Sequence, residues 1–291
     1  MFKSLLLRTA SGISLAKNEM PALEISALKK TPVRTVEPIE KVDRTPAVYG
    51  IIGAKGGVGA TTIAINLSVA LSRDFAPTTL VDANLQQPDA AVLLGQTTKV
   101  SISELVQRQA EIDKELLQAC SSSVAGAPNC SLLAPLADGS SALSTDLSQI
   151  SECLLAAKSL SPFWVLDLPQ HLDKHLVEIM DKCNKVILVL EPTMASIASA
   201  NRWLTIFTEL GYGESKVLCV LNRSGGKHSA VEEQLRSFPQ FAHAVRVPNA
   251  YSFLEKCSNE GEPAVLKNRR DIFSQSVFNL AKSLAESGQH V

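Results

Sequence analysis

The chain lacks both a strong excess of one charge and any long hydrophobic run. Its 291 residues include 28 basic and 29 acidic side chains, which gives a formal net charge of -1. This balance offers no global basic surface for nucleic acid or an anionic membrane. No run approaches the roughly 18 apolar residues of a membrane span, and the opening MFKSLLLR has too short an apolar centre for a secretory signal. We therefore expect a cytoplasmic protein that does not bind nucleic acid.

The cysteines lack the spacing of a metal or redox site. The six of them stand at positions 120, 130, 153, 183, 219 and 257 without a CxxC pair, and several lie in apolar runs such as KVLCVLN. We expect reduced residues in the core. Hydrophobic residues make up 45% of the chain and charged residues 20%, which suits one large α/β domain with a full core plus a tail.

Residues 1–45 lack a helical stripe longer than a turn or two. Pro21, Pro32 and Pro38 interrupt this stretch among alternating charges, and Pro46 follows it directly. We predict a flexible N-terminal tail over residues 1–45 and a single domain over 46–291. Two interpretations stay open for the first eight residues: a small amphipathic anchor for a membrane or a partner, or a disordered start. A position at a cell pole or at the periphery of the inner membrane therefore also stays open.

The stretch with the most chemical information runs from Ala47 to Asp82. An apolar run from Val48 to Ile52 predicts a buried strand, a glycine-rich loop GAKGGVGA follows, and a helical pattern begins at Thr61. Glycines can turn successive backbone N–H groups inward, and the start of a helix adds partial positive charge. The loop is therefore predicted to bind phosphates.

The candidate residues of this phosphate loop are Gly56, Gly57, Val58, Gly59, Ala60, Thr61 and Thr62. The Thr61 hydroxyl is placed to reach a magnesium ion. The next strand, Thr78 to Val81, ends in Asp82, whose carboxylate is predicted to face the same phosphates.

One residue departs from an ordinary phosphate loop. The pattern GxxxxGK[ST] has lysine where this chain has Ala60, although Lys55 stands earlier in the loop. The loop resembles the deviant Walker A motif, KGGxGK[ST], of the ParA/MinD family of ATPases, in which the early lysine reaches nucleotide across a dimer interface. With the early lysine kept and the late one lost, GGVGATT is most similar to the atypical branch that contains CpaE and TadZ, proteins of Tad/Flp (type IVc) pilus assembly.

The resemblance implies roles for residues farther along the chain. Asn84 stands at the second acidic position of the family's DxDxQ segment, and an amide cannot accept a proton as a carboxylate does. The apolar run Phe163 to Leu166 leads into Asp167, which matches the family's Walker B acid and implies a magnesium contact through water. Asn222 matches the residue that contacts adenine, Arg223 follows it, and Pro248 stands where a late loop borders the base.

Strands that alternate with helices predict a mostly parallel twisted sheet with helices on both faces. The resemblance implies that this sheet is that of a P-loop NTPase of the ParA/MinD type. The cofactors implied are ATP and Mg²⁺, with Lys55, Asp82 and Asp167 as candidate catalytic residues and Thr61 and Asp167 as magnesium contacts. The leading hypothesis is an ATP-binding homodimer that places pilus or secretion machinery with weak hydrolysis. The alternatives are an active ATPase in chromosome partition, division-site or flagellar placement, and a scaffold without nucleotide.

Two smaller patterns have competing interpretations. His171 and His175 lie four residues apart in a predicted helix, either as metal ligands or as solvated residues. The basic residues Lys267, Arg269 and Arg270 form either a local anion-binding patch or the solvated start of a helix.

Overall fold

The computed structural model describes residues 45–287 except 99, 137, 139, 226–230, 232–234 and 236–240. Residues 1–44, nearly all of the predicted tail, lie outside this part, and with them the segment considered as an amphipathic anchor.

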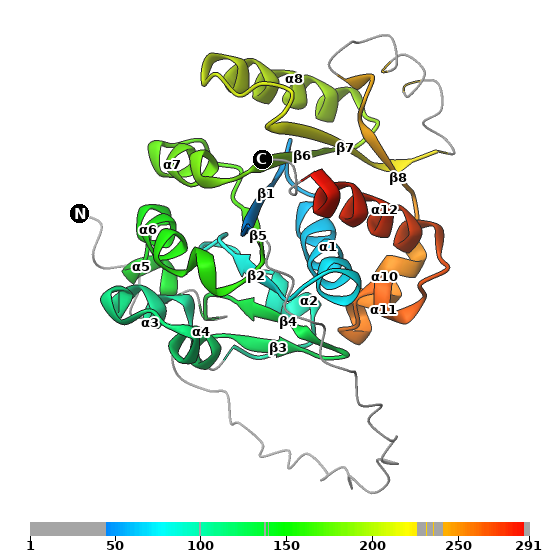
Figure 1. The fold of residues 1–291 in the computed structure, drawn as a ribbon. Coiled ribbons are helices and arrows are strands. Elements are labelled where there is room, and N and C mark those ends of the chain that lie inside the picture. Colours follow the sequence, from blue (N-terminus) through cyan, green and yellow to red (C-terminus); the bar gives the residue numbers. More distant parts are fainter. Residues whose placement is uncertain are drawn as a thin grey trace, which may run out of the picture. The chain divides into compact units, whose positions relative to one another are not determined.

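The described residues form an eight-stranded sheet in the order β3-β4-β2-β5-β1-β6-β7-β8 (Figure 1). All neighbouring strands are parallel except β3 and β4, which pair antiparallel at one edge. The strands are β1 (Ala47–Gly53), β2 (Thr78–Asp82), β3 (Ser122–Val124), β4 (Ala127–Leu133), β5 (Phe163–Leu168), β6 (Lys185–Leu190), β7 (Val217–Ser224) and β8 (Val245–Pro248).

Helices cover both faces of the sheet, which confirms the predicted fold class. On one face lie α1 (Ala60–Asp74), α2 (Ala90–Leu93), α10 (Tyr251–Glu260), α11 (Ala264–Lys267) and α12 (Ile272–Ser287). On the other lie α3 (Ile102–Gln107), α4 (Lys114–Cys120), α6 (Leu147–Ala157), α7 (Lys174–Lys182) and α8 (Met194–Glu209). The remaining short elements are α5 (Ser141–Ser144) and the 3₁₀ turns Gln109–Glu111 and Lys158–Leu160.

The central strand shows why both faces need a cover. In β1, Tyr49 and Ile51 belong to the apolar core beneath α1 and α12, whereas Val48 and Ile52 belong to the core on the opposite face. Successive side chains of a strand point to opposite faces, so a strand that is apolar throughout must be buried on both. The Tyr49 hydroxyl also donates to the Leu284 carbonyl of α12 (2.9 Å), which ties that helix to the sheet.

The cysteines agree with the sequence expectation of buried residues in the core. All six cysteines are free and buried. Among the described residues, no helix has the length and apolar character needed to cross a membrane.

Two helix and strand boundaries differ from the predictions. The apolar run from Cys130 to Leu136 predicts a strand from its sequence. The structure has β4 there, which ends at Leu133, and its antiparallel partner β3 was not predicted. The helix expected to carry both histidines starts at Lys174, so His171 precedes it and the paired-histidine face is wrong. His175 instead lies beside Glu178, with 3.4 Å between Nδ1 and Oε2. The described part of the chain contains no cluster of three or more His, Cys, Asp or Glu side chains able to hold a metal.

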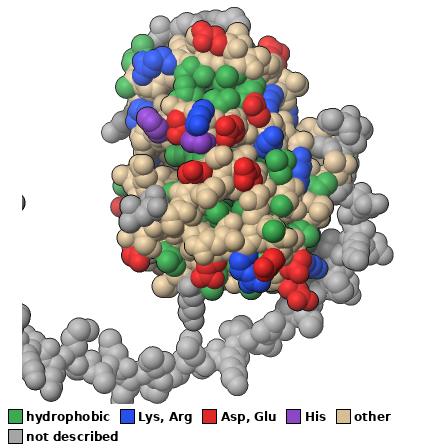
Figure 2. Space-filling view, turned by 90° about the vertical axis from the view of Figure 1, so that its left-hand side faces the viewer, with side chains coloured by type: hydrophobic (Ala, Val, Ile, Leu, Met, Phe, Trp, Pro, Cys, Tyr) green, Lys and Arg blue, Asp and Glu red, His purple; other side chains and the backbone are tan. Residues whose placement is uncertain are grey.

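The basic segment near α11 is largely neutralised by acidic partners. Lys267 pairs with Glu260 and with Glu262 (2.7 Å to the latter), and Arg269 pairs with Asp74 (2.9 Å). Figure 2 shows another face of the molecule, the left-hand side of Figure 1 and not the side of α11, where acidic, basic and histidine side chains are likewise interspersed below an apolar cluster. Two of the three basic residues of this segment thus form ion pairs within the protein. This favours the alternative without a bound anion, the start of a helix at the surface, over an anion-binding patch.

Candidate functional site

Parallel strands bring distant polar residues to one edge of the sheet. Asp82 of β2 is the register partner of Asp167 of β5, and Leu221 of β7 is the partner of Leu190 of β6. The carboxyl ends of these strands therefore lie at one edge, where the phosphate loop after β1 and Asn222 also lie. The structure thus brings together the loop, both carboxylates and the amide that the sequence singled out.

The phosphate loop is held by hydrogen bonds on both sides. The Ala54 N–H donates to the Val189 carbonyl of β6 (2.8 Å), and the side-chain amide of Asn222 donates to the Val58 carbonyl (2.8 Å). Gly59 is the N-cap of α1 in the left-handed conformation, with φ at 92°. The helix therefore begins at Ala60, one residue earlier than predicted, and its first N–H groups lack partners within the helix. Such a helix start favours anion binding.

Gly59 is also packed too closely for a side chain. A Cβ atom built there would lie 2.5 Å from Nδ2 of Asn222, whereas one built at Gly57, which has a φ of 78°, meets nothing within 4 Å. We expect Gly57→Ala to lower the free energy of unfolding by about 1 kcal/mol through backbone strain alone, and Gly59→Ala by about 2–3 kcal/mol. Denaturant titration of both variants measures the difference. Equal losses would show that the bond from Asn222 to Val58 does not hold the loop.

Asp82 is fully buried, and its carboxylate accepts hydrogen bonds from the backbone that follows it. Its Oδ1 accepts the Asn84 N–H (3.1 Å) and its Oδ2 accepts the Ala90 N–H (3.0 Å). Burial raises its pKa to about 6, and these two bonds work in the opposite direction. Asp82 therefore stabilises the conformation of the segment that leads into α2. Its candidate catalytic role remains a prediction.

Asp167 is the last residue but one of strand β5, is 3% exposed, and lies beside Asp82. Burial and, to a lesser extent, the nearby Asp82 raise its pKa to about 8, while a hydrogen bond with the Thr61 side chain acts in the opposite direction. The two residues predicted to contact magnesium are thus already paired. Carboxylate and hydroxyl oxygens are hard ligands suited to Mg²⁺, and a cation would relieve the repulsion between two buried carboxylates. The donor set fits this ion.

A cavity lies beside the residues predicted to contact the base. This cavity has a volume of about 190 Å³ and is lined by residues that include Gly59, Thr62, Asn222, Arg223, Asn249 and Tyr251. Pro248 ends β8, and the residue after it bonds through its N–H to the Ser224 carbonyl (3.0 Å). The cavity therefore joins the phosphate loop to the predicted base contacts, with Pro248 next to its lining.

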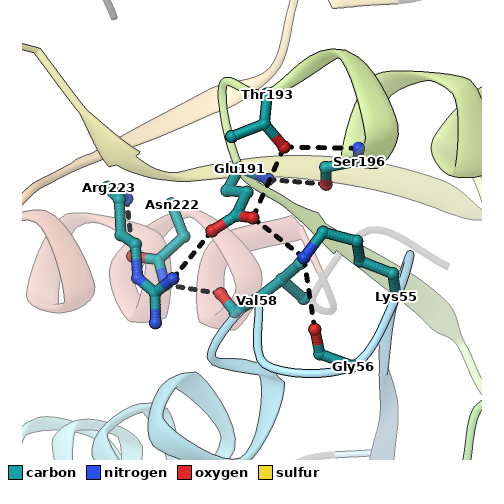
Figure 3. Close-up of polar contacts among 8 residues, drawn as sticks. All are labelled: Lys55, Gly56, Val58, Glu191, Thr193, Ser196, Asn222 and Arg223. Atoms are coloured by element: carbon teal, nitrogen blue, oxygen red, sulfur yellow. Dashed lines mark hydrogen bonds and ion pairs between the residues drawn. The ribbon is translucent and has the colours of Figure 1, made fainter. Parts of the chain in front are cut away.

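Lys55, the retained lysine, contacts residues of its own chain. Its Nζ atom is 2.9 Å from Oε1 of Glu191 and donates to the Gly56 carbonyl at 3.3 Å (Figure 3). Arg223 reaches the other oxygen of Glu191, with 2.7 Å between Nη1 and Oε2.

The sequence reasoning missed two residues of this site. Glu191 follows the apolar run of β6 directly and precedes a proline, so its position at a strand end was the available signal. Gln170 follows Asp167 by three residues, and its side-chain Nε2 lies 2.9 Å from a Cβ built at Gly53. A second polar group therefore covers the start of the phosphate loop.

Comparisons with known proteins found a matching family and similar solved structures. Residues 49–249 match the sequence model of the family described as CobQ/CobB/MinD/ParA nucleotide binding domain. The septum site-determining protein MinD of Synechocystis sp. is 22% identical over 241 residues, which cover 80% of this chain and 87% of that protein.

Two solved structures share the fold. A ParA family ATPase from Chlorobium tepidum TLS has a TM-score of 0.74 at 20% identity and covers 81% of this chain and 99% of its own. MinD from Pyrococcus horikoshii OT3, solved in complex with Mg-ADP, has a TM-score of 0.68 at 21% identity and covers 84% of this chain and 99% of its own. The phosphate loop of this chain therefore lies in a fold that carries Mg-ADP in a similar protein.

Proposed function

The chain belongs to the CobQ/CobB/MinD/ParA nucleotide-binding domain family, and from this premise we propose that it is an ATP-binding switch with weak hydrolysis. Two copies loaded with Mg-ATP associate face to face and separate slowly. The observation that carries this proposal is Ala60, which starts α1 at the position where ordinary phosphate loops have lysine.

Backbone groups and oxygen ligands are sufficient for the proposed binding. The N–H groups at the start of α1 bind the phosphates, while Thr61 and Asp167 hold Mg²⁺, partly through water. The bound ion neutralises charge on the phosphate oxygens. Asn222 and Arg223 line the cavity that receives the rest of the nucleotide.

Turnover is expected to suffer more than binding. Phosphoryl transfer depends on neutralising charge that develops in the transition state, and loss of one such group costs about a hundredfold or more in rate. Ala60 removes one cation, and Asn84 removes a carboxylate that could accept a proton. The proposed bound state is therefore long-lived.

The finer role proposed is that of the CpaE/TadZ-like branch. The retained Lys55 with the lost lysine at 60 supports placement or assembly of Tad/Flp (type IVc) pilus or secretion machinery, in the cytoplasm and at the periphery of the inner membrane. An active ATPase in partition, division-site or flagellar placement is the competing function, because the relatives found include septum site-determining proteins and a ParA family ATPase.

We expect the purified full chain to bind a fluorescent ATP analogue in the presence of Mg²⁺ and to release phosphate very slowly. Fluorescence titration measures binding, and a phosphate-release assay on the same preparation measures turnover. Thr61→Ala removes the hydroxyl beside Asp167 and is expected to weaken the magnesium-dependent part of binding. Thr205→Ala is the matched control, since its hydroxyl bonds within α8 to Asn201 (3.1 Å), on a different helix.

The outcomes separate the candidate functions. Slow turnover with clear binding supports the switch. Rapid turnover that Thr61→Ala abolishes would favour the active ATPase. A chain that binds no nucleotide would leave only the scaffold.

A further inference from the structure

Glu191 has a largely buried carboxylate that contacts Lys55 of the phosphate loop. Its side chain is 12% exposed and lies at the end of β6, between two cations from different parts of the chain. Figure 3 shows Lys55 of the loop and Arg223 of β7 approaching its two oxygens from different sides. One carboxylate therefore links the loop to the neighbouring strand.

The surrounding contacts hold this carboxylate in place. The Glu191 N–H donates to the Ser196 hydroxyl (3.0 Å), and the Thr193 hydroxyl lies 3.4 Å from Oε1. Burial alone would raise the pKa of Glu191, but Lys55 and Arg223 more than offset this and keep it below its usual value. The carboxylate is thus held in one position, and its two cationic partners keep it ionised.

The two cations differ in how firmly they are held. Arg223 has a φ of 55°, a left-handed conformation unusual for a residue with a side chain and the only such case among the described residues. That strain is maintained by the contact with Glu191 and by the bond from its N–H to the Asn222 side chain (2.9 Å). The two side chains are similarly exposed, 34% for Lys55 and 38% for Arg223. Lys55 nevertheless carries its charge on a flexible four-carbon stem, whereas the backbone of Arg223 is fixed beside Glu191, so Lys55 is the partner that can leave.

We propose that Glu191 is a positioning residue that holds Lys55 against its own protomer, so that this contact must open before Lys55 can reach a nucleotide phosphate. The inference rests on the proposed function, because the phosphate belongs to ATP bound in the associated state. When Lys55 leaves, Arg223 still neutralises Glu191, and no buried charge is left unpaired. Glu191 thereby sets how readily loaded protomers associate.

The first test measures the contact itself, without nucleotide. An amine-reactive acetylating reagent is applied to the wild type and to Glu191→Gln, and mass spectrometry gives the rate at Lys55. We expect a severalfold faster reaction in the variant, since the carboxylate no longer covers Nζ. Lys282, which is 66% exposed, is the internal reference. Glu178→Gln, which removes a carboxylate from α7, should change nothing at Lys55.

A second measurement on the wild type keeps the test valid if the variant folds poorly. Salt screens a partly exposed ion pair, so the Lys55 rate relative to Lys282 should rise between about 0.05 M and about 0.5 M salt. A ratio independent of salt, together with equal rates in the wild type and Glu191→Gln, would overturn the proposal.

The final experiment links the contact to association. Sedimentation with Mg-ATP should show Glu191→Gln associating about tenfold more tightly than the wild type, the effect of one charge-assisted contact no longer competing. In a Lys55→Ala background, Glu191→Gln should have no such effect, whereas a structural role of Glu191 would act in both backgrounds. Association equal to that of the wild type would overturn the inference and leave the switch intact. A wild type that binds no ATP would instead overturn the proposed function.

Discussion

Asp167→Asn is expected to stabilise the nucleotide-free protein above neutral pH and to abolish magnesium-dependent nucleotide binding. The wild-type carboxylate is buried beside Asp82, and burial raises its pKa to about 8. Ionising it in the folded state is therefore unfavourable, whereas an amide of the same shape carries no charge and can still accept a bond from Thr61. The same amide is a poor ligand for Mg²⁺, so binding is lost as stability is gained.

The pH dependence follows from the direction of the two shifts. The folded-state pKa values of Asp82 (about 6) and Asp167 (about 8) both lie above the unfolded value of 3.8. The folded state therefore holds more protons, and this contribution to stability is complete below pH 3.8 and lost as the pH rises through 6 and 8. For the wild type without nucleotide, we expect a loss on the order of a few kcal/mol between about pH 5 and about pH 9. Asp167→Asn should show a much smaller loss.

Thermal and denaturant unfolding at several pH values, with and without Mg-ATP, measure both effects. Glu152→Gln removes an exposed carboxylate from α6 and should keep the wild-type pH profile. His175→Ala should bind nucleotide like the wild type, because that histidine lies on α7 beside Glu178. If Asp167→Asn were less stable than the wild type at high pH, ionised Asp167 would not be unfavourable beside Asp82, and this explanation would be wrong.

The parts of the site that sequence can predict are those fixed by strand ends. Asp82, Asp167 and Asn222 each follow or close an apolar run, and parallel strands bring their carboxyl ends to one edge. The loop is equally predictable, because glycines at 57 and 59 are needed where φ is positive. These features depend on local pattern and on a single topological rule.

The partners of Lys55 could not be predicted in the same way. Glu191 lies 136 positions after Lys55, and the contact depends on β6 being the immediate neighbour of β1. Strand order is set by packing of the whole sheet, which periodicity does not reveal. Gln170 is similar, since its approach to Gly53 depends on the path of the chain after β5. The short edge strand β3 was missed because its three residues carry too little pattern.

The second large effect is expected for Lys55→Ala, which should weaken ATP-dependent association by about ten- to a hundredfold. A charge-assisted contact to a phosphate contributes about 1.5–3 kcal/mol, and that free energy corresponds to this change in affinity. In the free protein, the charge of Lys55 is paired with Glu191 of the same chain. Under the proposed function, we therefore expect its phosphate contact to form only in the associated state.

Stability should respond differently from association. Lys55 is partly exposed, and Arg223 continues to pair with Glu191 when the lysine is gone, so the free energy of unfolding should change by less than about 1 kcal/mol. Sedimentation with and without ATP, beside denaturant unfolding, separates the two quantities, and Lys282→Ala removes an exposed lysine of α12 as the control. An association that ignores both ATP and the loss of Lys55 would rule out the switch, because the loop would then contribute only structure to a permanent assembly.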